Sequence, residues 1–174
     1  MQDASTRMQS LIEGLLTYSR VSTKAQPFVE TNLDKICREV VSDLEVRIEQ
    51  TEAIVEILEL PKIEGDSLQM RQLFQNLISN ALKFQSEGTN PKVKIYSEKL
   101  PDQEIYQIFV SDNGIGFDEK YLDRIFGVFQ RLHGRSEYEG SGIGLSVCKK
   151  IVERHNGEIT AKSKIGEGTT FIIT

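Results

Sequence analysis

The sequence predicts an α/β fold in which a mixed sheet of about five strands packs on three helices as a two-layer sandwich. Segments with the alternating pattern of strands are interspersed with longer segments of helical periodicity. The 174 residues are 39% hydrophobic and 27% charged, an ordinary composition for a globular domain. A chain of this length can bury roughly two-thirds of its unfolded surface, which suffices for one domain and an appendage.

The appendage is a predicted helix over residues 3–23. Met8, Leu11, Ile12, Leu15 and Leu16 recur at spacings of three and four residues, as on one face of a helix. This face either packs on the domain that follows or pairs with another chain. We expect pairing, in a homodimer. The polar residues 22–27 end in proline and predict a linker.

The remaining elements follow in order. Asn32 and either Asp66 or Ser67 are suitable N-cap residues for two of the core helices. We predict helices over residues 32–50, 66–85 and 141–155, and strands over residues 28–31, 53–60, 92–99, 104–111, 157–163 and 169–173.

The helix over residues 66–85 has two distinct faces. One face is apolar, whereas Asn76, Asn80 and Lys83 lie one turn apart on the other. A carboxamide oxygen can bind a hard divalent cation, and an ammonium group can meet a phosphate. Taken alone, the helix is better explained by a solvated polar face.

Three glycine-rich segments punctuate the second half of the chain. Residues 112–116 read Asp-Asn-Gly-Ile-Gly at a strand end, and residues 140–145 run Gly-Ser-Gly-Ile-Gly-Leu into a helix. Free N–H groups at a helix N-terminus can bind phosphates, and an aspartate can accept a hydrogen bond from an exocyclic amine. Each segment alone is also an ordinary turn, as is Gly-Glu-Gly-Thr at residues 166–169.

The sequence disfavours several functional classes of protein. The net charge of -5 argues against nucleic acid as a partner, and no apolar run approaches the ~20 residues of a membrane-spanning helix. Cys37 and Cys148 lack CxxC spacing and predict reduced thiols in a cytosolic protein, with a disulfide between them left open. The P-loop, the dinucleotide-binding fingerprint and the protein-kinase HRD and DFG motifs are missing from the sequence.

The motifs NLISNALKF, DNGIGF, FGVFQRL, GSGIGL and GEGTTF occur in this order. Together they resemble the ATP-binding catalytic domain of sensor histidine kinases, a branch of the GHKL superfamily, and are similar to phytochrome-type two-component kinases. The resemblance implies a Bergerat-type fold for residues 26–174. Residues 1–25 resemble the second helix of a dimerisation and phosphotransfer hairpin, which is only partly present.

The resemblance also implies roles for matching residues at the base and phosphates of ATP. Asp112 would bind the adenine amine, supported by Thr169. Asn80 would hold Mg²⁺, and Asn76 and Lys83 would position the phosphates. The base pocket would be shaped by Gly114, Ile115 and Gly116, and the phosphates would be wrapped by Gly140, Ser141, Gly142, Ile143, Gly144 and Leu145.

A lid over residues 127–139 is implied as well. Phe126 and Phe129 would anchor it, and Arg131 would reach the γ-phosphate. Core packing is the alternative for the two phenylalanines, and an ordinary surface position is the alternative for Arg131.

The function implied is a protein-histidine kinase that transfers the γ-phosphoryl group of ATP to a histidine outside this chain. His133 and His155 lack the expected sequence context, so the acceptor helix and a response regulator receiver domain are the expected partners. A nucleotide-binding module without turnover is the alternative. An ATP-driven clamp is disfavoured, because Asn76 stands where the clamp ATPases carry a water-activating glutamate. We expect a cytoplasmic location, although the full-length protein could be membrane-anchored.

Overall fold

The computed structural model describes residues 2–85, 88–127 and 144–174. Its centre is a five-stranded sheet in the order β2-β4-β5-β7-β6. Strand β2 is parallel to β4, and all other neighbours are antiparallel, so the sheet is mixed as predicted. The strands are β2 (Ile54–Ile57), β4 (Lys92–Lys99), β5 (Tyr106–Asp112), β6 (Ile159–Lys164) and β7 (Gly168–Ile173).

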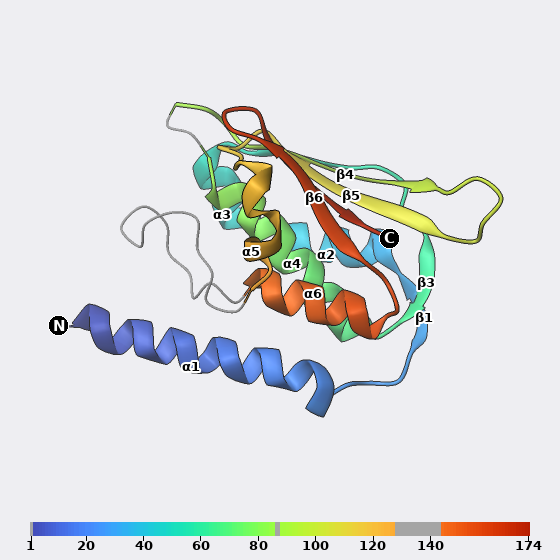
Figure 1. Ribbon diagram of the computed structural model, residues 1–174. Helices are drawn as coiled ribbons and strands as arrows, with labels where there is room; N and C mark the ends of the chain where they lie inside the picture. The colour runs from blue at the N-terminus through green and yellow to red at the C-terminus, as the bar shows by residue number, and fades with distance from the viewer. Residues whose placement is uncertain (1, 86–87, 128–143) are drawn as a thin grey trace.

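Three helices cover one face of this sheet, which confirms the two-layer sandwich (Figure 1). They are α2 (Leu33–Asp43), α4 (Ser67–Lys83) and α6 (Gly144–Arg154). Helix α4 contacts both of the others and supplies the fully buried Phe74, Leu77 and Ile78. Inward-facing sheet residues such as Ile95 and Val110 complete the core. Burying these apolar side chains is the main stabilising contribution to the fold.

Some elements differ from the sequence prediction. Strand β1 (Val29–Asn32) leaves the main sheet and pairs with β3 (Lys62–Gly65), a strand that the sequence pattern did not reveal. Strand β3 has four residues with one apolar side chain between charges, too short a pattern for periodicity to detect.

The predicted helix over residues 32–50 is two helices, α2 and α3 (Glu45–Thr51), separated at Leu44. Leu44 leaves the helical region with φ -97° and ψ 10°, yet it stays packed against the core. The apolar spacing therefore runs on unbroken across the kink. The short elements η1 (Glu119–Tyr121) and α5 (Leu122–Ile125) were likewise not predicted.

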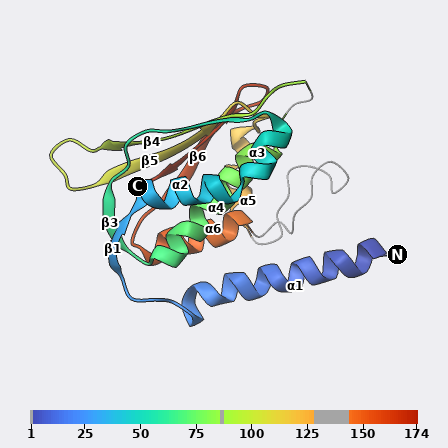
Figure 2. The ribbon, with the colours of Figure 1, turned by 180° about the vertical axis from the view of Figure 1, so that it is seen from behind.

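Helix α1 (Gln2–Thr23) lies outside the sandwich and runs alongside α6 (Figures 1 and 2). One of its sides faces the domain, where Tyr18 is half-buried and Val21 is 2% exposed. The expectation that α1 pairs with another chain rather than with the domain was therefore incomplete. An adjacent apolar stripe remains uncovered and comprises Met8, Ile12, Leu15 and Leu16. Pairing through this stripe stays a prediction.

In the described residues no helix is long and apolar enough to cross a membrane. The two cysteines are free and buried, so the described structure contains no disulfide between Cys37 and Cys148.

Candidate functional site

Helix α4 carries its polar face towards the start of α6. Asp66 is the N-cap of α4, with its carboxylate accepting the N–H of Gln69 at 3.1 Å, so the helix begins where the sequence predicts. Further along, the Asn76 carboxamide donates to the carbonyl oxygen of Gly144 at 3.4 Å. The predicted polar face and the last part of the predicted phosphate loop are therefore in contact.

Asn80 and Lys83 lie on the next turns of α4. The Asn80 side chain is half-buried and makes no hydrogen bond among the described residues. The Lys83 ammonium lies 5.1 Å from the centre of the Phe84 ring. A half-buried carboxamide beside an ammonium group is a donor set suited to a hard cation and phosphate oxygens.

Asp112 ends β5 in a largely buried position. Its Oδ1 accepts the N–H groups of Gly114 at 2.8 Å and Thr169 at 3.3 Å. Burial raises the pKa of the carboxyl group to about 6, against the opposing effect of these two hydrogen bonds. No hydrogen bond from the described residues uses Oδ2, so this oxygen is available to an external donor.

The turn after Asp112 is clamped by backbone contacts on both sides. The N–H of Ile115 donates to the Phe84 carbonyl at 3.0 Å, and the Ile115 carbonyl accepts from Gly166 at 2.8 Å. A Cβ on Gly114 would lie 2.2 Å from the Phe84 oxygen, and Gly116 has φ +67° with the Lys164 oxygen 2.1 Å from the corresponding position. These glycines are therefore required by packing between protein backbones.

Gly144 is different. A Cβ there would meet only the Asn76 carboxamide, at the ordinary contact distance of 3.9 Å. Packing within the described structure does not require a glycine at this position. A glycine that these described contacts do not require allows close approach of a ligand.

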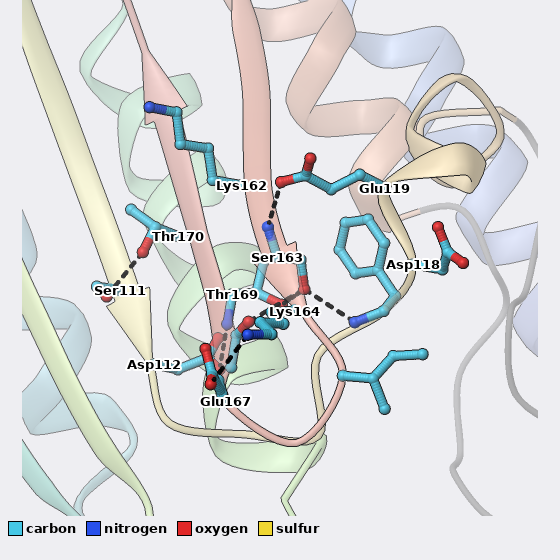
Figure 3. A pocket seen from close by; sticks show the side chains of 13 residues that line it. Ser111, Asp112, Asp118, Glu119, Lys162, Ser163, Lys164, Glu167, Thr169 and Thr170 are labelled. Atoms are coloured by element: carbon cyan, nitrogen blue, oxygen red, sulfur yellow. Dashed lines mark hydrogen bonds and ion pairs between the residues drawn. The ribbon is translucent and has the colours of Figure 1, made fainter.

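Thr169 supports Asp112 through its backbone rather than its hydroxyl group. The Thr169 hydroxyl lies 2.8 Å from that of Ser163, which also accepts the N–H of Phe117 at 2.8 Å (Figure 3). A hollow of about 810 Å³ opens beside these residues. Its lining includes Asp112 and Thr169 but no residue of α4, so it is distinct from the space between Asp112 and Asn80.

Part of the predicted site lies outside the described residues. This applies to Phe129, Arg131, His133, Gly140, Ser141, Gly142 and Ile143, and to the lid beyond Gly127. Phe126 is buried, with its ring edge-on to that of Phe171 at 6.2 Å, so it belongs to the core next to the predicted lid. Leu145 is half-buried in the first turn of α6.

Gln85 borders the site and was not predicted from the sequence. Its amide nitrogen donates to the Ala81 carbonyl at 2.7 Å and faces Gly114, while its buried Oε1 has no partner among the described residues. The available signal was its position directly after the polar face of α4.

The comparisons with known proteins agree with this geometry. A family model described as histidine kinase-, DNA gyrase B-, and HSP90-like ATPase matches residues 65–174. The chain belongs to this family. The matched segment runs from the start of α4 to the end of β7 and thus contains the polar face, the Asp112 turn and α6.

Within this family the chain is similar to sensor kinases. Cyanobacterial phytochrome A from Nostoc sp. strain PCC 7120 is 47% identical to this chain. The match covers 96% of this chain but only 21% of the length of the phytochrome. The catalytic domain of histidine kinase ThkA superposes with a TM-score of 0.69 at 29% identity, covering 85% of this chain and 96% of that one. Histidine kinase ThkA, solved in complex with response regulator protein TrrA, superposes with a TM-score of 0.72 at 26% identity. This superposition covers 99% of the present chain and 48% of the ThkA chain.

Proposed function

We propose that this chain binds Mg·ATP and transfers the γ-phosphoryl group to a histidine carried outside it, as the catalytic part of a two-component sensor kinase. The observation that carries this proposal is the contact between Asn76 on α4 and Gly144 at the start of α6. It joins an amide-rich helix face to the N-terminus of α6, a combination suited to phosphates. The chain spans about a fifth of the phytochrome relative, so the whole protein's activity is part of the proposal.

Asp112 recognises the base in this proposal. Its free Oδ2 accepts the exocyclic amine of adenine, while Oδ1 stays bound to the N–H groups of Gly114 and Thr169. Gly114, Ile115 and Gly116 form the turn that holds the carboxylate in place. The carboxylate is partly desolvated, which strengthens a hydrogen bond that it accepts.

Asn80 is the residue that would hold Mg²⁺. The described residues contain no cluster of three His, Cys, Asp or Glu that could hold a metal, so a cage made only of protein ligands is not seen there. Mg²⁺ commonly takes few protein ligands and completes its octahedron with phosphates and water. The Asn80 carboxamide, which has no hydrogen-bond partner in the described part of the chain, fits that role. When bound, the ion neutralises charge on the phosphates.

Asn76, Lys83, Gly144 and Leu145 would position the phosphates at the start of α6. The resemblance adds Gly140, Ser141, Gly142 and Ile143 as wrapping residues, and Phe129 and Arg131 from the lid, which stay predictions. An imidazole nitrogen of the acceptor attacks the γ-phosphorus, the bond from that phosphorus to the β,γ-bridging oxygen breaks, and ADP leaves. Phosphoryl transfer of this kind requires mainly positioning and charge neutralisation.

The residues of this site favour transfer over hydrolysis. Asn76 has a carboxamide, which is a poor base and does not activate water efficiently. Its nitrogen is already directed to the Gly144 carbonyl. Slow hydrolysis would preserve ATP until an acceptor histidine arrives.

The acceptor and the partners follow from the proposed domain division. Residues 1–25 would be the second helix of the dimerisation hairpin, and residues 26–174 the catalytic domain. The exposed stripe of α1 supports a homodimer, because large apolar side chains that adjoin on one helix face commonly mark an interaction surface. The ThkA complex with a response regulator supports a receiver domain as the subsequent phosphoryl acceptor. A cytoplasmic location stays a prediction.

Labelling with γ-³²P-ATP tests the proposal. Alone with Mg²⁺ and ATP, this chain should bind nucleotide and form no base-stable, acid-labile phosphohistidine. A longer chain that also carries the upstream acceptor helix should become labelled on that histidine. Nucleotide binding without labelling in the longer chain would favour the alternative, a binding module without turnover.

A further inference from the structure

A buried polar junction connects the end of α1 and the linker to the catalytic domain. Its centre is the Asp66 carboxylate, which is 1% exposed. Besides capping α4, Asp66 accepts the N–H of Gln26 in the linker at 2.8 Å and pairs with Arg154 at 2.9 Å. One carboxylate therefore holds together the linker, the start of α4 and the end of α6.

Arg154 uses its fork to bind three partners in this junction. Nη1 donates to Asp66 and to the Gln69 side-chain oxygen at 2.8 Å, and Nη2 donates to the Gln26 carbonyl at 2.7 Å. Gln69 in turn donates to the carbonyl of Val21, in the last turns of α1, at 2.8 Å. A lysine has a single ammonium group and lacks this planar fork, so it could not reproduce the geometry.

His155 and Phe28 close the junction on the linker side. The Asp66 N–H donates to Nε2 of His155 at 3.0 Å, and Nδ1 then donates to the Ile151 carbonyl at 2.7 Å. The Phe28 ring stacks on His155 with centres 4.5 Å apart, and the Arg154 guanidinium lies 4.7 Å from the centre of the Phe28 ring. Both nitrogens of His155 are thus occupied, which explains why this histidine has a structural role.

The junction also determines the direction of α1 relative to α6. Lys150, one turn before Arg154, donates to the Tyr18 carbonyl at 3.1 Å and lies 4.3 Å from the centre of its ring. Arg154, further along α6, contacts Gln26 in the linker that follows α1. The two helices therefore run in the same direction, as Figures 1 and 2 show. The other end of α6, roughly 15 Å away by helical rise, is Gly144 beside Asn76.

We propose that Arg154 is a positioning residue for phosphoryl transfer. Through Asp66, Gln69 and Gln26 it holds α1 at one angle to α6, so that the Gly144 end of α6 faces a histidine carried beside α1. This inference rests on the proposed function. Nucleotide binding does not need these contacts, because no residue of the junction belongs to the base or phosphate positions.

A distance measurement tests the positioning directly. Spin labels are placed at Ser10 on α1 and Thr160 on β6, two exposed residues. Burial raises the thiol pKa of Cys37 and of Cys148 to about 12, so the native cysteines react poorly with the label. The unchanged chain should give one narrow distance distribution, and Arg154→Lys should give a distribution at least twice as broad.

Two further variants control this measurement. Lys149→Gln removes an exposed cation that pairs only loosely with Glu153, at 3.9 Å, and should leave the distribution narrow. Gln69→Met keeps the helix and its volume but releases the Val21 carbonyl, and should broaden the distribution even if Arg154→Lys fails to fold. Equal widths for the unchanged chain and a folded junction variant would overturn the inference.

Kinetics separate positioning from mere structural support. In the longer kinase that carries the acceptor histidine, Arg154→Lys should lower the rate of histidine phosphorylation at least tenfold. The KM for ATP and the calorimetric Kd should stay within twofold of the unchanged kinase. If the unchanged chain does not bind ATP, the proposed function fails. If it binds ATP but Arg154→Lys leaves transfer unaltered, only the positioning role fails.

Discussion

The two ends of the proposed nucleotide site are built in different ways. At the base end, Asp112 is held by N–H groups of Gly114 and Thr169, and the turn is fastened to Phe84 and Gly166. At the phosphate end, the described residues provide no hydrogen-bond partner for Asn80 and no packing contact that requires a glycine at position 144. The base end is preorganised by the fold itself, whereas the phosphate end keeps groups free for ligands. Changes to the backbone packing at the base end should therefore affect stability, whereas changes at the phosphate end should affect binding alone.

The sharpest test of this difference compares two glycine-to-alanine variants. Gly114→Ala should lower the free energy of unfolding by more than about 3 kcal/mol, because the new Cβ would lie 2.2 Å from the Phe84 carbonyl oxygen. Gly144→Ala should change it by less than about 0.5 kcal/mol, since among the described residues its Cβ would meet only Asn76, at 3.9 Å. Urea unfolding of both variants gives the values. If both variants lost a similar free energy of unfolding, the base end would not be more tightly packed than the phosphate end.

Asp112→Asn should weaken ATP binding by about a hundredfold without unfolding the protein. An amide offers a donor as well as an acceptor at the position where the proposed adenine amine needs a carboxylate, and charged hydrogen bonds contribute about 1.5–3 kcal/mol. Calorimetric titration measures the affinity, and circular dichroism checks the fold. Binding as tight as in the unchanged chain would show that the base position is misassigned.

The same variant should change the dependence of stability on pH. The pKa of Asp112 is raised from 3.8 to about 6 by burial, so the folded state favours the protonated form. Protonated Asp112 therefore contributes up to about 3 kcal/mol to the free energy of unfolding. This contribution is fully present below pH 3.8 and is lost as the pH rises through about 6. Unfolding free energies measured between pH 4 and 8 should therefore fall more steeply for the unchanged chain than for Asp112→Asn. If the two curves of unfolding free energy against pH were parallel, the pKa of Asp112 would not be raised in the folded state.

ATP affinity should weaken below pH 6, because a protonated Asp112 no longer offers a charged acceptor to the adenine amine.

The smallest effect is expected at the phosphate end. Asn80→Ala should weaken ATP binding about tenfold with Mg²⁺ present and less with EDTA, because it removes one oxygen ligand from the ion. Stability should stay nearly constant, since the Asn80 side chain makes no hydrogen bond in the described structure. Titrations under both conditions decide the matter. An equal loss in the two would assign Asn80 a role unrelated to the metal.

Local pattern in the sequence was sufficient for the main elements and for the order of the site residues. The helical spacing of Phe74, Leu77 and Ile78 gave α4 an inner face, and the same spacing placed Asn76 and Asn80 together on the outer one. Asp112 at the end of a predicted strand and the glycines that follow were likewise visible. These features depend on neighbours within a few residues of each other, which is the range that periodicity reports.

Contacts between distant segments were decided by the tertiary structure. No local pattern shows that Gly114 meets Phe84, or that Asp66 pairs with Arg154 across 88 positions of sequence. His155 bonds the Ile151 carbonyl in its own helix, and its other ring nitrogen accepts the N–H of Asp66 at the start of α4. Likewise the apolar face of α1 predicted pairing with another chain. Only the assembled domain showed that Tyr18 lies against α6 and that Val21 is buried, while Met8 and Ile12 remain exposed. Residue types set which contacts are chemically possible, but the packing of the whole chain selects which of them form.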